Sequence, residues 1–195
     1  MHGLINRAIQ CFLRDTYGAE LWADVARAAQ VERGGFEAML SYPDALTDKV
    51  LAVAAERVGV PRVMMLEDMG TYLVSDPGLE ALRRLLRFGG ETFLEFLYSL
   101  DDLPERTRLA VPDLHLPDLE LAEDGVGAFV LQCRGGWPGL AFVLQGMLRA
   151  MADDYGALAL IDTAEGGEAG ATLSIRLLDA RFHAGKSFSL AARGQ

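Results

Sequence analysis

Residues 100–119 read LDDLPERTRLAVPDLHLPDL, with prolines at positions 104, 112 and 117. Residues 91–103, just before the first of these prolines, have the most amphipathic helical pattern in the chain. Proline lacks an amide donor and disfavours helical geometry in the residue before it, so Pro104 is expected to end or kink that helix. After Pro117, apolar and polar residues alternate as they do in strands. The stretch therefore predicts the boundary between a helical half and a half that contains a sheet.

The part of the chain before this boundary has the apolar spacing of amphipathic helices. Gly18 and Gly59 are expected to end two of them, because glycine readily adopts the left-handed conformation of a helix end. Thr47 is a predicted N-cap, and Pro61 suits the first turn of a further helix. Helices are expected at residues 4–17, 19–29, 48–58 and 61–74, followed by a turn at 76–78 and a short helix to residue 87.

The part after the boundary is predicted to contain strands and one long helix. The strands are expected at residues 119–123, 128–133, 157–162 and 172–178, and the helix at 139–155. Residues 187–191 are expected to add an edge strand or to fray. The predicted fold class is α+β, with a helical N-terminal half packed on a C-terminal antiparallel sheet that carries one long helix.

The length of 195 residues, of which 51% are hydrophobic, suits a single domain that spans residues 1–195 with one shared core. Within it we expect a helical part at about 1–118, an α/β part at about 119–178 and a tail at 179–195. A net charge of −10 argues against nucleic acid as a partner, because such binding depends on neutralising phosphates. No apolar run is long enough to span a membrane, and the N-terminus does not look like a secretory signal. Cys11 and Cys133 form no disulfide framework, so we expect a cytoplasmic protein.

Several motifs in this order and spacing resemble one known family. The opening MHGLIN of residues 1–6, the Tyr17-Gly18 pair, YPD at 42–44, LEDMG at 66–70 and QGML at 145–148 are similar to haem–nitric oxide/oxygen-binding (H-NOX) domains. The resemblance extends to about residue 178. It implies the α+β fold described above and a role as a sensory signalling domain.

The same resemblance places the family's iron-ligating histidine at Pro104, which has no lone pair to give to iron. Val111-Pro112 stands in place of a Tyr-Pro pair, and Pro117 falls on a second family proline. The chain therefore resembles a gas-sensor fold that lacks the key ligand of the sensor.

The family binds haem propionates through a Y-x-S-x-R motif, which the resemblance places on residues 130–134. Val130 and Gln132 replace the two hydroxyl donors, and only Arg134 is kept. An arginine can still pair with a carboxylate or a phosphate. The distal wall of the haem pocket is implied near Ile5, Ile9 and Gly139. These positions carry no hydroxyl, so any bound haem would be expected to favour nitric oxide over oxygen.

Haem remains a conditional cofactor, because iron accepts axial ligands other than the usual histidine. His115 lies in the loop before Pro117 and is the first candidate, although a loop histidine between two leucines more often faces water. His2 and His183 lie near the termini. Cys133 beside Arg134 is a further candidate, but a cysteine on an alternating strand is more often a buried apolar residue.

The charged clusters give little support for catalysis. No nucleophile elbow, phosphate-binding glycine loop or zinc-binding HExxH motif is present, so the protein is not expected to be an enzyme. The acidic pairs at 101–102 and 153–154 are expected to be solvated, as are the arginines Arg83, Arg84 and Arg87.

The leading functional hypothesis is an H-NOX signalling domain that has lost ordinary haem ligation. Its pocket would be filled by side chains, or by a small apolar ligand anchored at Arg134. Family resemblance implies a signalling partner such as a histidine kinase or a diguanylate cyclase or phosphodiesterase. Two alternatives stay open at this stage: a haem-based nitric oxide sensor that uses His115, and an interaction scaffold without any ligand.

Overall fold

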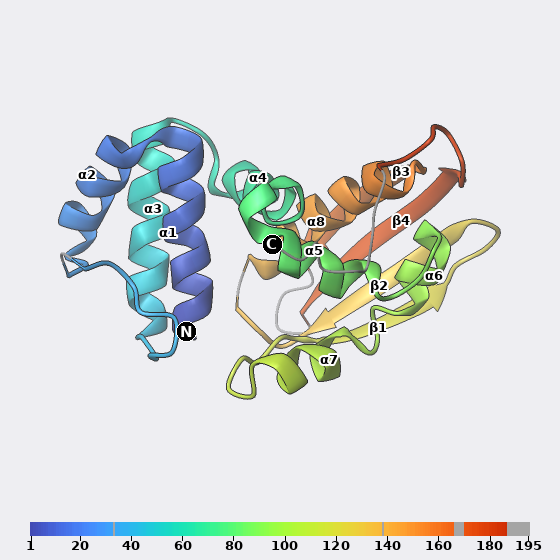
Figure 1. The fold of residues 1–195 in the computed structure, drawn as a ribbon, viewed down its shortest axis with the longest axis horizontal. Helices are drawn as coiled ribbons and strands as arrows, with labels where there is room; N and C mark the ends of the chain where they lie inside the picture. The colour runs from blue at the N-terminus through green and yellow to red at the C-terminus, as the bar shows by residue number, and fades with distance from the viewer. Residues whose placement is uncertain (33, 138, 166–169, 187–195) are drawn as a thin grey trace, which may run out of the picture.

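The computed structural model describes residues 1–32, 34–137, 139–165 and 170–186. It has the expected α+β organisation, with helices from α1 to α7 followed by a four-stranded antiparallel sheet and the long helix α8 (Figure 1). The strand anticipated at 187–191 lies outside the described residues. No helix in the described part of the chain combines the length and the apolar character that a membrane crossing requires.

Three helices form a bundle at one end of the molecule (Figure 1). They are α1 (Gly3–Tyr17), α2 (Ala19–Ala29) and α3 (Asp44–Val58). Gly18 and Gly59 follow α1 and α3 with φ values of 98° and 77°, so both predicted helix ends are confirmed.

The predicted start of α3 was wrong. Pro43, not Thr47, is the N-cap residue, and Thr47 is fully buried inside the helix. Its hydroxyl donates to Oδ1 of Asn6 at 2.7 Å, which satisfies a buried acceptor on α1. Helix α4 (Arg62–Ser75) likewise begins one residue later than expected, with Pro61 at its N-cap.

The sheet has the strand order β1-β2-β4-β3, with every neighbouring pair antiparallel. Its strands are β1 (Asp118–Glu123), β2 (Ala128–Arg134), β3 (Leu158–Glu165) and β4 (Ala171–Asp179). Helix α8 (Leu140–Tyr155) shares a core cluster with the inner face of the sheet and lies between that sheet and the α1–α3 bundle (Figure 1).

The buried apolar side chains of the described residues form two hydrophobic clusters, rather than the one shared core expected. The first contains Ile9 and Phe12 of α1 together with Met65 of α4 and Val143 of α8. The second joins α5–α8 to the sheet. Met147 packs against both clusters. The division arises because α4 and α8 cross between them, so each helix buries different sides of its surface in different clusters.

Pro104 opens a helix instead of ending one, which corrects the expectation for residues 91–103. Helix α6 (Phe93–Tyr98) ends early, and α7 (Leu103–Ala110) begins after a turn with Pro104 in its first turn. The amides of a first turn have no partner within the helix, so proline costs no hydrogen bond there. The side chain of Arg106 connects the two helices by donating to the carbonyl oxygen of Ser99 at 2.9 Å.

The acidic and basic residues around α5 (Glu80–Arg87), which follows the single turn η1 (Pro77–Leu79), are not a solvated rim. Asp154 is only 1% exposed and accepts hydrogen bonds from both Nε and Nη2 of Arg83. The guanidinium of Arg87 lies 3.9 Å from the ring centroid of Tyr155. The expectation of solvated charge was therefore wrong for Asp154, whereas Asp153 is exposed as predicted.

Candidate functional site

Pro104 is buried in the first turn of α7, beside Leu103 and Thr107. Its ring nitrogen is an amide with no lone pair for a metal, so this position cannot ligate iron. Pro117 is also buried, at the end of the loop that follows α7. It faces Gly136, where an added Cβ would lie 3.1 Å from the Cβ of Pro117.

His115 is exposed on the loop between α7 and β1. Its Nδ1 lies 3.0 Å from the carbonyl oxygen of Asp113, two residues earlier. The contact is local and solvent-facing, and the ring is not buried in either core cluster. The structure therefore does not bring His115 and Pro104 together inside the core.

The three motif positions on β2 lie on the outer face of the sheet. Phe129, Leu131 and Cys133 point into the core, so Val130, Gln132 and Arg134 point the other way, as the two-residue period of a strand requires. Nη2 of Arg134 lies 2.7 Å from Oε2 of Glu120 and 2.7 Å from Oε1 of Gln132. Both partners are on the outer face, so Arg134 is engaged away from the interior.

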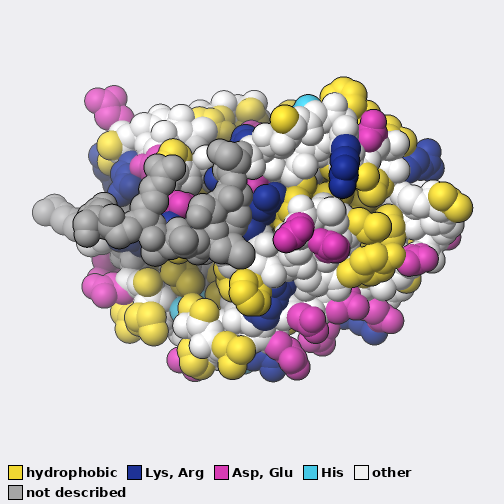
Figure 2. All heavy atoms as spheres, turned by 45° about the vertical axis from the view of Figure 1, so that its right-hand side comes forward, with side chains coloured by type: hydrophobic (Ala, Val, Ile, Leu, Met, Phe, Trp, Pro, Cys, Tyr) yellow, Lys and Arg dark blue, Asp and Glu magenta, His cyan; other side chains and the backbone are white. Residues whose placement is uncertain are grey.

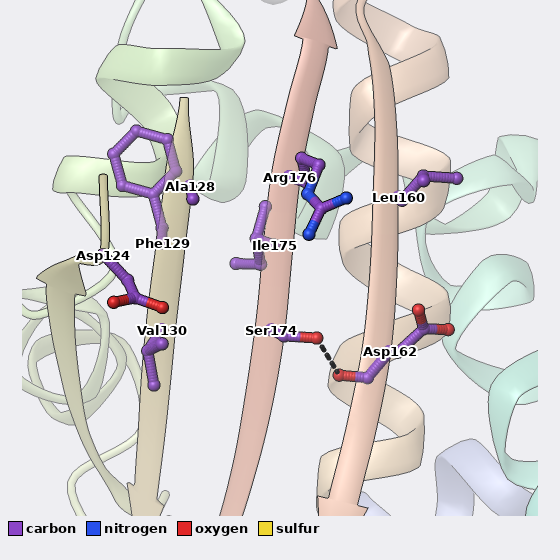
Figure 3. A pocket seen from close by; sticks show the side chains of 9 residues that line it. All are labelled: Asp124, Ala128, Phe129, Val130, Leu160, Asp162, Ser174, Ile175 and Arg176. Carbon is purple, nitrogen blue, oxygen red and sulfur yellow. Dashed lines mark hydrogen bonds between the residues drawn. The ribbon is translucent and has the colours of Figure 1, made fainter. Parts of the chain in front are cut away.

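A shallow hollow of about 180 Å³ lies on the same outer face (Figure 3). Small side chains, including Ala128, Val130 and Ser174, form its floor, and Arg176 and Asp162 flank it. Ser174 Oγ donates to the carbonyl oxygen of Asp162 at 3.4 Å. The hollow is open to solvent and mixes one cation with carboxylates, so it does not have the apolar enclosure that a porphyrin needs.

Charge on the molecular surface is mixed. Figure 2 shows acidic and basic side chains interspersed on one face, with hydrophobic side chains between them. Together with the net charge of −10, this distribution offers no basic stripe on that face of the kind that nucleic-acid backbones require.

Cys133 lies within the second core cluster, and burial raises the pKa of its thiol to about 11 from an ordinary value of 9.0. The thiolate, which is the form that binds a metal, is therefore disfavoured at this position. In the described part of the chain, no group of three or more His, Cys, Asp or Glu side chains is placed to hold a metal ion.

Selective alkylation should report this difference between the two cysteines. At pH 8 in the folded protein, iodoacetamide is expected to modify the partly exposed Cys11 at least tenfold faster than Cys133, because a rise of about two pKa units leaves far less thiolate. Mass spectrometry of peptides at timed intervals measures both rates. The burial of Cys133 would be contradicted if Cys11 and Cys133 were alkylated at equal rates in the folded protein and the ratio of the two rates were the same in urea.

The distal positions lie in the other part of the molecule. Ile9 is fully buried and Ile5 partly buried, and both pack in the first cluster with the α1–α3 bundle. Leu103, next to Pro104, belongs to the second cluster. Ile5 and Ile9 thus pack in a different cluster from Leu103, the neighbour of Pro104, and α4 and α8 cross between the two clusters.

Trp137 is a residue of this region that the sequence analysis missed. It is only 8% exposed and belongs to the same cluster as Ile9 and Leu66. The guanidinium of Arg62 lies 5.7 Å from its ring centroid. The indole Nε1 is buried without a hydrogen-bond partner among the described residues. The signal that could have found it is the pair of glycines immediately before a large aromatic residue, which indicates a loop shaped around that side chain.

Taken together, these side chains do not fit a haem in the arrangement that the structure shows. Pro104 offers no donor atom, Cys133 favours its thiol form, and His115 and Arg134 are directed to solvent or to surface partners.

Comparison with known proteins identifies the fold. A family model described as haem-NO-binding matches residues 2–161. H-NOX proteins of S. oneidensis in the Fe(II)NO state and of K. algicida in the unliganded Fe(II) state superpose with TM-scores of 0.76 and 0.77, each at 16% identity. Each match covers 92% of this chain, and 100% and 97% of those chains.

Among curated proteins, the chain is 24% identical to soluble guanylate cyclase 89Db of Drosophila melanogaster over 156 residues. It is 25% identical to soluble guanylate cyclase gcy-31 of Caenorhabditis elegans over 154 residues. These matches cover 80% and 79% of this chain but only 23% and 22% of the two cyclases, so the chain spans less than a quarter of the length of these relatives. With the family model matching most of its length, the chain belongs to the haem-NO-binding family, whose members carry the H-NOX sensor domain.

Proposed function

We propose that this protein is an H-NOX signalling domain that regulates a partner without iron held at the helix α7. The observation that carries the proposal is the buried Pro104 in the first turn of that helix. A histidine at a first-turn position would point an imidazole from the helix start, whereas proline fixes the backbone and offers no electron pair. The helix is thus retained as a structural element while its ligand is gone.

The remaining positions support the same conclusion. Arg134 is bound to Glu120 on the outer face of the sheet, so it cannot also hold a carboxylate in the interior without breaking that ion pair. His115 would have to leave its local contact and enter the core to reach a ligand there. A ligating histidine further needs a second partner that fixes its ring, and its described contact is with a carbonyl in its own loop.

The partner would be a signalling enzyme. The guanylate cyclases among the relatives are several times longer than this chain, which suggests an output that resides outside the matched region. By family resemblance we propose a histidine kinase, or a diguanylate cyclase or phosphodiesterase, with this domain supplying regulation and no catalysis. The mixed surface charge in Figure 2 is compatible with a protein partner.

Reconstitution with hemin tests the proposal. The wild-type protein is expected to give only the broad absorption of loosely associated hemin, with no sharp Soret band that shifts on addition of nitric oxide, because no axial donor is placed for iron. His115→Ala should leave this spectrum unchanged, and His183→Ala serves as a matched control for loss of an exposed histidine. A sharp, nitric-oxide-sensitive band that disappears only in His115→Ala would overturn the proposal in favour of a haem-based sensor.

A further inference from the structure

The outer face of the sheet carries exposed apolar side chains at one end. Leu178 on β4 is 52% exposed, and Val126 in the turn between β1 and β2 is fully exposed. The amide of Leu177 donates to the carbonyl oxygen of Gly127 at 2.8 Å, so the turn lies beside the end of β4. Because side chains alternate along a strand, Leu178 shares the outer face with Arg176 and with the hollow drawn in Figure 3. An exposed leucine is common on its own, so the charges around it decide what can cover it.

A row of residues crosses the outer face at this hollow. In the register of the sheet Ala128 pairs with Arg176, and Arg176 pairs with Leu160. The amide of Asp124 donates to the carbonyl oxygen of Ala128 at 2.8 Å, which places Asp124 on the other side of Ala128. Figure 3 shows Ala128 between the Asp124 carboxylate and the Arg176 guanidinium. The row therefore has an acidic and a basic group on either side of a small side chain.

Neither of these two charges is neutralised by the described part of the chain. Both residues are exposed, and no ion pair or hydrogen bond joins the Arg176 guanidinium or the Asp124 carboxylate to another described residue. By contrast, Nη2 of Arg134 on the same face lies 2.7 Å from Oε2 of Glu120. An exposed and unpaired charge can form an ion pair with another molecule without first breaking one inside its own chain.

Such a row is complementary to a second copy of itself. A two-fold axis that runs along β2 through Ala128, between two facing sheets, exchanges the places of Asp124 and Arg176. Each Arg176 then lies opposite Asp124 of the other copy, so a dimer contains this pair twice. Val130 lies two residues further along β2 on the same face, and the small side chains near the axis let the two sheets approach each other. Sheets in proteins pack face to face in a similar aligned manner, roughly 10 Å apart.

The same axis accounts for the apolar end of the face. It brings Leu178 of each copy toward the β1–β2 turn of the other, where Val126 is exposed, so both side chains lose contact with water. Arg134 on β2 faces its own copy, and its pair with Glu120 offsets that repulsion. The net charge of −10 opposes association at long range, but physiological salt screens exposed charges beyond about 8 Å. The contacts at the face itself therefore decide whether two copies associate.

We propose that two copies of this chain associate through the outer faces of their sheets, with Arg176 of each copy paired with Asp124 of the other. A second copy fits this face because the row carries both signs symmetrically, whereas a purely basic or purely acidic partner would oppose one of the two charges with its own sign. The inference goes beyond the proposed function and does not depend on it, since it requires neither the presence nor the absence of iron.

Sedimentation velocity of the full chain, at concentrations from micromolar to submillimolar, tests the inference. The wild type is expected to change from monomer to dimer as the concentration rises. Arg176→Asp and Asp124→Arg should each weaken this association at least about tenfold, because each places like charges opposite one another at both pairs. An equimolar mixture of the two variants should recover the dimer, since each chain then supplies the sign that the other lacks.

Leu178→Glu tests the apolar part of the contact and should also weaken the dimer at least about tenfold. Leu109→Glu is the matched control, because Leu109 is 87% exposed but lies on α7 and not on the sheet. It should associate like the wild type. Circular dichroism checks that every variant is folded, and Leu178→Ser replaces Leu178→Glu if the glutamate variant fails to fold.

Each contrary result overturns a stated part of the inference. A wild type that stays monomeric throughout the concentration range overturns it and leaves this face to a different protein or to solvent. A dimer that persists unchanged in both charge variants and in Leu178→Glu forms through another surface. If each charge variant is monomeric and their mixture is monomeric too, Arg176 does not pair with Asp124. A ligated haem in the wild type would overturn the proposed function and leave this inference standing.

Discussion

Gly146→Ala is expected to lower the free energy of unfolding by about 3 kcal/mol, which for a chain of this size lowers the Tm by about 6–12 °C. An added Cβ at Gly146 would lie 1.9 Å from the carbonyl oxygen of Glu67 and 2.8 Å from its carbonyl carbon. Both are backbone atoms of α4, so a change of side-chain rotamer cannot relieve the clash. The helices α4 and α8 would have to separate, and the packing that both clusters share at this crossing would loosen.

The opposite side of the same crossing gives an internal check. An added Cβ at Gly70 would lie 2.0 Å from the carbonyl oxygen of Val143, so Gly70→Ala is expected to destabilise by a similar amount. Gly34→Ala is the matched control, because an added Cβ there meets nothing within 4 Å. Thermal and urea unfolding measure all three variants. A Gly146→Ala protein as stable as Gly34→Ala would show that the helices do not cross as closely as described.

Asp154→Ala is the second change with a large expected effect, a loss of about 3 kcal/mol. The carboxylate is 1% exposed and receives two hydrogen bonds from Arg83, with the Nε···Oδ2 distance at 3.1 Å. Nη1 of Arg87 lies 3.8 Å from Oδ2. Removing the carboxylate takes away the counter-charge that the largely buried guanidinium groups of Arg83 and Arg87 share, so α5 would lose its ion pairs with the end of α8.

Asp153→Ala provides the control for this prediction, because the neighbouring carboxylate is exposed and its loss should change stability by less than about 0.5 kcal/mol. Urea unfolding followed by circular dichroism measures both variants under identical conditions. Asp154→Asn, which keeps the shape and one acceptor, is expected to fall between them. Equal stability of Asp154→Ala and Asp153→Ala would contradict a buried ion pair at this position.

Sequence rules predicted a structural feature correctly where that feature depends only on neighbouring residues in the chain. The ends of α1 and α3 followed from Gly18 and Gly59, because a glycine with positive φ stops a helix irrespective of what packs around it. The alternation along β2 indicated a strand with one buried face, and the structure places Leu131 on that face. The order of helices and strands was also recoverable, since each element has its own periodicity.

The same rules were insufficient at Pro104. A proline is compatible both with the end of one helix and with the first turn of the next. The choice depends on contacts that helix propensity does not specify. Arg106 donates to the carbonyl oxygen of Ser99, seven residues earlier, and Oδ1 of Asp101 accepts from the amide of Leu121 on β1, twenty residues later. These contacts stabilise a turn between α6 and α7 that the local sequence pattern does not predict.

The sequence by itself determined the family and the α+β class, because both depend on residue identity and on spacing along the chain. The tertiary structure alone decided that Asp154 is buried, that Arg134 faces outward to Glu120, and that Trp137 enters the interior. The physical reason is that burial and charge pairing depend on which distant segments meet. Here the close crossing of α4 and α8 brings those segments together, and the spacing of residues in the sequence does not encode the position of that crossing directly.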